Sequence, residues 1–380
     1  MNRNRQIWVL LSIILVFGIL LCGFAIDGNY LQNNAKSTLN FINIDNTFAN
    51  IREKRASNIE IMPYSGEGDE TPSVLPDQTE EEYRELASKN SKNAKRNLMV
   101  GKIVVEQTSK RVLYGENENE KLYPASTTKV LTALCVLNNL PLDRVVTVPK
   151  IAEGVEGSSI YLKAGQKITV EDLLFGLMLR SGNDAAVTLA VETSGSIENF
   201  ARLMNETAKE CGAKNSNFVN PHGLHDENHY TTAYDLAQIA AKAYENDDFV
   251  RIASSKLKKI KVDDVETVIA NKNKMLKLYD GANGVKTGFT KASGRCLVSG
   301  AKQGGMQLIS VVLNCGDMWN ESVRLLDFGF DNYEMVSIER AMLSGGATLV
   351  EASITTPVNG DWSDVRFPMK RDGSEKLVLR

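Results

Sequence analysis

Cysteine is scarce in this chain, and the few cysteines present lack the spacing of a metal site. The 380 residues include five cysteines, none of them in a C-x-x-C pair. Disulfide scaffolds need a denser set, and zinc ribbons and thioredoxin-like sites need the paired spacing. We therefore expect none of these classes of protein, and we expect the following cysteines to be free thiols: Cys135, Cys211, Cys296 and Cys315.

The chain also lacks an excess of positive charge. It has 44 Lys and Arg against 47 Asp and Glu, a net charge of −3. Proteins that bind nucleic acid usually carry a strongly basic face, so we expect no nucleic-acid partner. Hydrophobic residues make up 43% and charged residues 24%, which is ordinary for a folded protein and excludes disorder throughout.

One long hydrophobic run is present, at residues 7–26, directly after Arg3 and Arg5. Twenty uncharged residues at helical rise span a bilayer core. The two arginines predict a cytoplasmic N-terminus. We interpret 1–26 as a transmembrane signal-anchor, which places the rest of the chain on the extracytoplasmic side of the cell membrane. The alternative is a cleaved signal peptide, since Gly23-Phe24-Ala25 fits a cleavage site and cleavage would release the protein.

Composition divides the remaining chain into three parts. Residues 27–97 lack apolar periodicity and are rich in polar and acidic residues, which predicts a largely disordered stalk. Residues 98–332 predict a hairpin turning at 108–110, many helices, a second hairpin turning at 303–305, and a helix over 321–327. That order indicates an α/β (α+β) fold with an antiparallel sheet flanked by helices. Residues 333–380 predict a small C-terminal all-β appendage.

The helix expected after Pro124 carries a serine and a lysine on one face. Its apolar positions are nearly continuous, which is typical of a buried helix. Ser126 and Lys129 are three residues apart and therefore lie side by side. Burial lowers the pKa of a lysine, so Lys129 can act as a neutral base toward the Ser126 hydroxyl. Ser255 and Lys258 share this spacing in a solvated, Lys-rich stretch, so the spacing alone is weak evidence.

A second polar element, Ser181-Gly182-Asn183, interrupts two predicted helices. Such a break can present a hydroxyl and a carboxamide at the edge of a cleft. Ser181 could relay a proton, and Asn183 offers both a donor and an acceptor to an amide substrate. The alternative is an ordinary helix-capping turn.

The third element, Lys286-Thr287-Gly288, lies within a predicted strand. Alternation places Lys286 and Gly288 on one face, and the glycine leaves room for another backbone to approach. Lys286 and Thr287 suit the carboxylate of a peptide that pairs along the strand edge, although alternation aims Thr287 away from Lys286. The alternative is an exposed edge strand with an ordinary lysine.

These elements in this order, Ser-x-x-Lys, Ser-x-Asn and Lys-Thr-Gly, resemble the D-alanyl-D-alanine carboxypeptidases, the serine-type low-molecular-mass penicillin-binding proteins with a β-lactamase/transpeptidase-like fold. The resemblance runs from about Leu98 to Phe330. It includes the segments PASTTKVLTAL, GSSIYLKAGQKITVEDLLFGLMLRSGNDAA, FVNPHGLHDENHYTTAYDLA, GVKTGFTKASGRCLVSGAK and NESVRLLDFGF.

The resemblance implies a reaction and a role for each residue. The enzyme would remove the terminal D-alanine from peptidoglycan stem peptides ending in D-Ala-D-Ala, through an acyl-enzyme, without metal or organic cofactor. β-Lactam antibiotics would acylate it covalently, and its role would be cell-wall synthesis and remodelling. The implied roles are Ser126 as nucleophile, Lys129 as base, Ser181 as proton relay, Asn183 as binder of the substrate amide, Lys286 and Thr287 as binders of the terminal carboxylate, and the N–H groups of Ser126 and of Phe289, next to Gly288, as oxyanion hole.

The chain departs from its relatives in two places. Many relatives have an arginine shortly before the NES segment, where this chain has Met318 and Trp319, so a second carboxylate anchor is in doubt there. Relatives often continue into a larger β domain and an amphipathic membrane helix, and this sequence stops at Arg380. The N-terminal anchor would then attach the protein to the membrane.

Three alternative functions have weaker support in the sequence. A β-lactamase needs a glutamate that activates the deacylating water, and the segment NSNFVNPHGLHDEN offers no convincing one. A metal enzyme could use His222, His225 and His229 beside Asp226, but the stretch is rich in turn residues. A non-catalytic peptidoglycan or β-lactam binder would be expected to lack Lys129, which is present.

Overall fold

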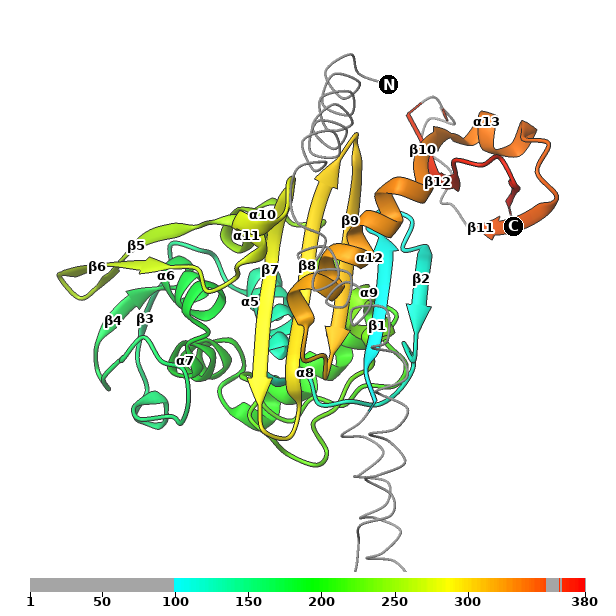
Figure 1. The fold of residues 1–380 in the computed structure, drawn as a ribbon. Helices are drawn as coiled ribbons and strands as arrows, with labels where there is room; N and C mark the ends of the chain where they lie inside the picture. Colours follow the sequence, from blue (N-terminus) through cyan, green and yellow to red (C-terminus); the bar gives the residue numbers. More distant parts are fainter. Residues whose placement is uncertain (1–98, 353–361, 363, 380) are drawn as a thin grey trace, which may run out of the picture. The chain divides into compact units, whose positions relative to one another are not determined.

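A five-stranded antiparallel sheet, in the order β2-β1-β9-β8-β7, forms the centre of the part of the chain that the structure describes (Figure 1). The computed structural model describes residues 99–352, 362 and 364–379. The strands are β1 (Gly101–Glu106), β2 (Val112–Glu116), β7 (Ala282–Thr290), β8 (Gly294–Gln303) and β9 (Met306–Leu313). Strands from both ends of the domain therefore share one sheet, which confirms the predicted fold class.

Both predicted hairpins are present. β1 and β2 turn through residues 108–110, where Lys110 has a φ of 58° and the Glu106 carboxylate accepts from Ser109 N at 2.7 Å. β8 and β9 turn at Gly304 and Gly305, with φ of 54° and 84°. Left-handed backbone favours glycine, which explains why the sequence marks the second turn clearly.

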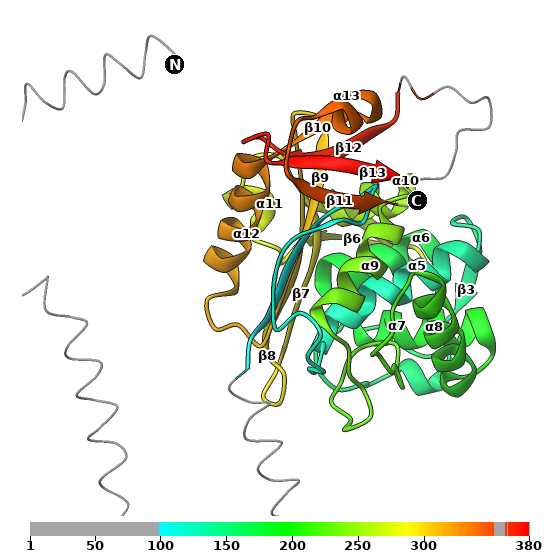
Figure 2. The same cartoon turned by 90° about the vertical axis from the view of Figure 1, so that its right-hand side faces the viewer.

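Helices cover the two faces of this sheet unequally (Figure 2). One face packs on the helical layer that includes α5, α7, α8 and α9, and α12 covers the other. The helices are α5 (Lys129–Asn139), α6 (Val170–Phe175), α7 (Asn183–Ser194), α8 (Ile197–Glu210), α9 (Ala233–Ala243), α10 (Asp247–Ser254), α11 (Met275–Leu278) and α12 (Met318–Asn332). α12 is longer than predicted: it begins at Met318, which packs in the same buried cluster as Leu325 and Leu326, and it continues to Asn332.

The helix α5 is central, as its composition predicted. Every residue from Lys129 to Val136 is buried. The prediction was wrong about its start: residues Ala125–Thr128 form a 3-10 turn, and the α-helix begins at Lys129. The turn forms because Thr127 bonds back to the Pro124 carbonyl through both its N–H and its hydroxyl.

A second sheet, β3-β4-β5-β6, was not predicted. Its strands are β3 (Val145–Thr147), β4 (Lys167–Thr169), β5 (Leu257–Val262) and β6 (Val265–Ala270). Each of β3 and β4 has three residues, too few to show an alternating pattern. Ser255 and Lys258 do not form a pair: the Ser255 hydroxyl donates to the Arg251 carbonyl, and Lys258 lies 3.4 Å from Glu171.

The C-terminal residues form β10 (Tyr333–Ser337), α13 (Ile338–Leu343), β11 (Thr348–Ala352), β12 (Arg366–Lys370) and β13 (Glu375–Leu379). β10 pairs antiparallel with β12, and β11 pairs parallel with β13. Short strands were predicted near β11, β12 and β13; neither β10 nor the helix α13 was predicted. The Ser337 hydroxyl accepts from Arg340 N at the start of α13, a capping signal that a short helix makes easy to overlook.

Arg111 joins the β1–β2 turn to the C-terminal strands. Its guanidinium makes two contacts with the Glu375 carboxylate, at 2.5 and 3.1 Å, and donates to the Pro368 carbonyl. The same group lies over the rings of Tyr333 and Phe367, at 5.2 and 5.6 Å. Because Glu375 is 4% exposed, this is a buried ion pair with few alternative partners.

Replacing Glu375 with glutamine should loosen the C-terminal strands. The Arg111 cation would remain buried without its anion, a change that typically costs about 3–5 kcal/mol of unfolding free energy. Denaturant unfolding and limited proteolysis measure it. Arg340→Ala is the control, because its pair with Glu334 is at 3.6 Å and Arg340 is 73% exposed, so a cost of about 0–1 kcal/mol is expected. Equal behaviour of the two variants would contradict the buried-pair account.

The predicted membrane span at residues 7–26 and the predicted stalk at 27–97 lie outside the described residues. Within the described ranges, none of the helices combines the length and the apolar character needed to cross a membrane.

Candidate active site

The 3-10 turn that carries Ser126 is held in an unusual backbone conformation. Ala125 has a φ of 48°, in the left-handed region that residues other than glycine rarely adopt. Gly223 packs so tightly on this turn that a Cβ at its position would lie 1.9 Å from the Ala125 carbonyl oxygen. The loop around Gly223 therefore fixes the turn, and with it the position of the Ser126 side chain.

The Lys129 amine lies directly beside Ser126. Its Nζ is 3.0 Å from Ser126 Oγ, and it donates to Asn183 Oδ1 and to the His222 carbonyl oxygen, each at 2.7 Å. Lys129 is fully buried. The pair expected from the S-x-x-K spacing is therefore present, and two acceptors from distant segments orient the amine.

Burial lowers the pKa of the Lys129 amine well below its ordinary value. The positive charge of Lys286 lowers this pKa further and Lys272 adds to the effect, while the Asp184 carboxylate opposes them. A lysine whose pKa is lowered can act as a base toward a neighbouring hydroxyl without a histidine.

Asn183 connects the lysine to a loop over residues 156–162. Its Nδ2 donates to the Glu156 carbonyl at 2.5 Å, and its backbone N–H donates to the Ser158 carbonyl at 2.7 Å. A Cβ on Gly157 would lie 2.8 Å from Asn183 Nδ2, so the loop approaches closely only because glycine stands there. Both ends of the carboxamide are therefore engaged within the protein.

Asp184 was missed in the sequence. Its buried carboxylate accepts from the Ser159 hydroxyl at 2.6 Å and from the backbone N–H groups of Ile160 and Leu162. It thus fixes the same loop that Asn183 contacts. An acidic residue in the first turn of a helix is so common that the sequence offered no signal of this longer-range role.

Ser181 follows the π-helical turn Gly176–Arg180 and has a φ of 65°. The predicted interruption between two helices is present, and Ser181 is 6% exposed. Asn183 contacts Lys129 directly. Ser181 is near the site because it lies two residues before Asn183 in the chain.

The strand β7 runs past the Ser126 turn. A Cβ on Gly288 would lie 3.1 Å from Ser126 N and 3.0 Å from the Pro124 carbonyl oxygen, so only glycine allows the two backbones to approach. Lys286, on the same face, is 2% exposed, and its Nζ donates to the Thr287 carbonyl at 2.9 Å. Burial and the charge of Lys272 lower the pKa of Lys286 to about 7.

The three histidines do not converge on a common point. Both ring nitrogens of His229 have protein partners, Thr128 Oγ1 at 2.8 Å and Val219 N at 3.1 Å. His222 accepts from Leu224 N through Nδ1, and the His225 ring packs against Tyr123. Across residues 99–352 and 364–379 no group of three or more acidic, histidine or cysteine side chains is placed to hold a metal ion. His229 and His222 instead support the loop that contacts Lys129.

All four cysteines of the described chain are buried and free, as expected from the sequence. They are Cys135, Cys211, Cys296 and Cys315. Burial raises the pKa of the Cys296 thiol to about 12, so this cysteine next to β7 is not a competing nucleophile.

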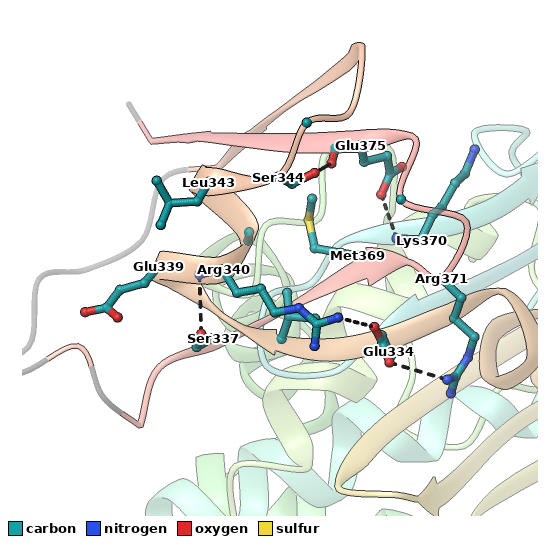
Figure 3. Close-up of a pocket in the computed structure, with 14 residues that line it drawn as sticks. Glu334, Ser337, Glu339, Arg340, Leu343, Ser344, Met369, Lys370, Arg371 and Glu375 are labelled. Atoms are coloured by element: carbon teal, nitrogen blue, oxygen red, sulfur yellow. Dashed lines mark hydrogen bonds and ion pairs between the residues drawn. The ribbon is translucent and has the colours of Figure 1, made fainter.

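A hollow of about 600 Å³ lies among α13, β10, β12 and β13, apart from the Ser126 cluster (Figure 3). Arg340 and Arg371 both reach the Glu334 carboxylate, at 3.6 and 3.5 Å. These charges are paired with one another, and no serine–lysine pair is among the lining residues. The candidate site is therefore the cluster around Ser126, not this hollow.

Comparison with known proteins identifies what this arrangement is similar to. Residues 89–316 match the family model described as D-alanyl-D-alanine carboxypeptidase. The carboxypeptidase DacF of Bacillus subtilis is 36% identical over 241 residues, covering 61% of this chain and 62% of that protein. DacC of Escherichia coli is 38% identical over 250 residues, covering 62% of each. The chain thus spans 62% of the length of these curated relatives.

Solved structures agree with these relatives. An S216A mutant of the Streptomyces K15 DD-transpeptidase is 31% identical, with a TM-score of 0.59 over 61% of this chain and 97% of that chain. A D-alanyl-D-alanine carboxypeptidase of Mycobacterium tuberculosis is 33% identical, with a TM-score of 0.58 over 61% of this chain and 90% of that chain.

Proposed function

Since the chain belongs to the D-alanyl-D-alanine carboxypeptidase family, we propose that it is a serine-type hydrolase that removes the terminal D-alanine from peptidoglycan stem peptides through an acyl-enzyme on Ser126. The observation that carries this proposal is the buried Lys129 amine 3.0 Å from the Ser126 hydroxyl. We propose Ser126 as nucleophile and Lys129 as its base.

The partners of Lys129 support its role as a base. A neutral amine has two N–H bonds and one lone pair. Asn183 Oδ1 and the His222 carbonyl oxygen can only accept, so they take the two N–H bonds. The lone pair is then directed at the remaining neighbour, Ser126 Oγ. The amine is therefore oriented to accept the hydroxyl proton as the serine attacks.

The reaction then proceeds by acyl transfer. Ser126 Oγ attacks the carbonyl carbon of the scissile peptide bond while its proton passes to Lys129. The tetrahedral intermediate collapses, the C–N bond breaks, and D-alanine leaves with a proton supplied from Lys129, for which Ser181 is the proposed relay. Water then attacks the ester, and Ser126 regains its proton.

The oxyanion would be bound by the backbone N–H groups of Ser126 and Phe289. Their proposed pairing is supported by the close approach of Gly288 to Ser126 N. Lys286 and Thr287 are the proposed binders of the terminal carboxylate. Asn183 is the proposed binder of the substrate amide, and the substrate would have to displace the Glu156 carbonyl from Asn183 Nδ2.

β-Lactams would enter the same site as mimics of the D-Ala-D-Ala end and acylate Ser126 stably. The proposed place of action is the outer side of the cell membrane, where the substrate is, with residues 7–26 as the anchor. The proposed role is cell-wall synthesis and remodelling.

Mass spectrometry of a stem pentapeptide ending in D-Ala-D-Ala tests this function. Hydrolysis should give the tetrapeptide and free D-alanine in equal amounts. A larger product formed with an added amine acceptor would indicate transpeptidation, and an unchanged peptide would refute the enzyme and favour a binding protein. Rapid turnover of penicillin without a lasting adduct would favour the β-lactamase alternative instead.

A further inference from the structure

The two buried lysines of the proposed site are weak sources of positive charge for a substrate that ends in a carboxylate. The amine of Lys286 is buried, its pKa is lowered to about 7, and its Nζ already donates to the Thr287 carbonyl. Burial also lowers the pKa of Lys129 well below its ordinary value. Burial therefore weakens the positive charge that both lysines can offer.

Sheet register identifies a permanent cation nearby. Phe289 on β7 lies directly opposite Arg295 on β8, and Thr287 lies opposite Leu297. Opposite residues point to the same face of a sheet, and successive residues alternate. Gly288 faces the Ser126 turn, so Thr287, Phe289 and Arg295 point to the other face, where Leu297 packs with residues of α12.

The Arg295 guanidinium is available on that face. It lies 5.4 Å from the centre of the Phe289 ring, and the phenylalanine is 61% exposed. Among the described residues, no carboxylate lies within ion-pair distance of Arg295. β7 is the outermost strand of the sheet, so a ligand paired along it meets Thr287 and Arg295 from the same side.

The start of α12 leaves this corner without another arginine. The Arg295 carbonyl accepts from Cys315 N at 2.8 Å, which places the start of β8 next to the residues that lead into α12. Met318 and Trp319 begin that helix. Arg295 therefore places a guanidinium between the β7–β8 turn and the start of α12, at the end of the hairpin that approaches Ser126.

We propose that Arg295, stacked on Phe289, binds the terminal carboxylate of the substrate together with Thr287. A guanidinium stays charged at every physiological pH and can bind a carboxylate through two parallel hydrogen bonds. The aromatic ring beneath it limits its motion and holds the charge at the edge of β7. This inference rests on the proposed function and makes Arg295 the residue that selects substrates with a free carboxyl end.

Two matched peptides test the inference in the full chain: an acyl-L-Lys-D-Ala-D-Ala peptide and the same peptide with a C-terminal carboxamide. The unmodified protein should prefer the free acid. Arg295→Gln should lower kcat/KM for the free acid by about 10- to 100-fold, as expected for the loss of a charge-assisted hydrogen bond. The same variant should leave kcat/KM for the carboxamide peptide unchanged. Arg295→Lys should recover part of the preference.

Three further variants complete the test. Lys291→Gln removes the same charge from the same hairpin without the ring contact and should leave the preference intact. Two other lysines are competing cations: Lys274, whose Nζ lies 6.0 Å from the Trp319 ring, and Lys272, whose charge lowers the pKa of both site lysines. If Lys272→Gln or Lys274→Gln removes the preference and Arg295→Gln does not, the inference is overturned.

The inference is also overturned if the unmodified protein cleaves both peptides equally well, although the proposed function would then stand. If it cleaves neither peptide and penicillin does not label Ser126, the proposed function itself fails and Arg295 has no substrate to bind.

Discussion

Replacing Ser126 with alanine is expected to abolish covalent labelling of the protein by a fluorescent penicillin. The acyl bond forms on the Ser126 oxygen, and the alanine variant has no oxygen there. The neighbouring groups cannot substitute, because the Lys129 amine is held between two carbonyl acceptors and the Cys296 thiol has a pKa raised to about 12. Gel fluorescence of the purified full chain, before and after denaturation, measures the label.

Ser255→Ala is the matched control for this experiment. Ser255 and Lys258 repeat the S-x-x-K spacing, but the structure gives each a different partner, Arg251 and Glu171. Full labelling is therefore expected. If the Ser126→Ala variant is still fully labelled, and the label is located on another peptide of the protein, another residue is the nucleophile.

Replacing Lys129 with alanine is expected to slow acylation by about 10²- to 10⁴-fold, the range typical of general-base catalysis. The variant should also be less stable, because Asn183 Oδ1 and the His222 carbonyl lose their buried donor, at about 1–3 kcal/mol for each unsatisfied group. The rate of penicillin acylation is therefore compared only after thermal unfolding has shown that the variant is folded. Lys258→Ala, which removes a half-buried lysine that pairs with Glu171, should leave the acylation rate unchanged.

The pH dependence separates a base from a structural lysine. Burial lowers the pKa of Lys129, so the neutral amine that can act as a base is lost, and acylation should decline, as the pH falls through that lowered pKa. Asn183→Asp places a carboxylate on the amine, which raises its pKa, so the acid limb of the rate profile should move to higher pH. An unmoved limb in a folded Asn183→Asp variant would mean that Lys129 does not act as the base.

The sequence predicted the fold where local pattern and packing agree. The hairpin turn at Gly304-Gly305 is marked by residues that tolerate left-handed backbone. The continuous apolar run after Lys129 predicted a buried helix, and α5 is buried. The small β3-β4-β5-β6 sheet was missed because its shortest strands have three residues and depend on partners far along the chain.

The sequence predicted the three motifs of the candidate site separately, but it could not show that they lie close together in the folded protein. Spacing alone placed Ser126 beside Lys129, since both lie within one turn of chain. The approach of Gly288 to Ser126 N joins residues 162 positions apart, and the structure alone shows it.

The residues that orient the site also separate what the sequence predicts from what the tertiary structure decides. By itself, the sequence determined which groups could react, because the proposed nucleophile, the proposed base and the carboxamide are side chains at short spacings. The tertiary structure decided how they behave: it buried Lys129, supplied the His222 carbonyl and Asn183 as acceptors, and tied the loop to Asp184. The reason is physical, since a pKa depends on burial and neighbouring charge, and both are set by segments that meet only when the chain folds.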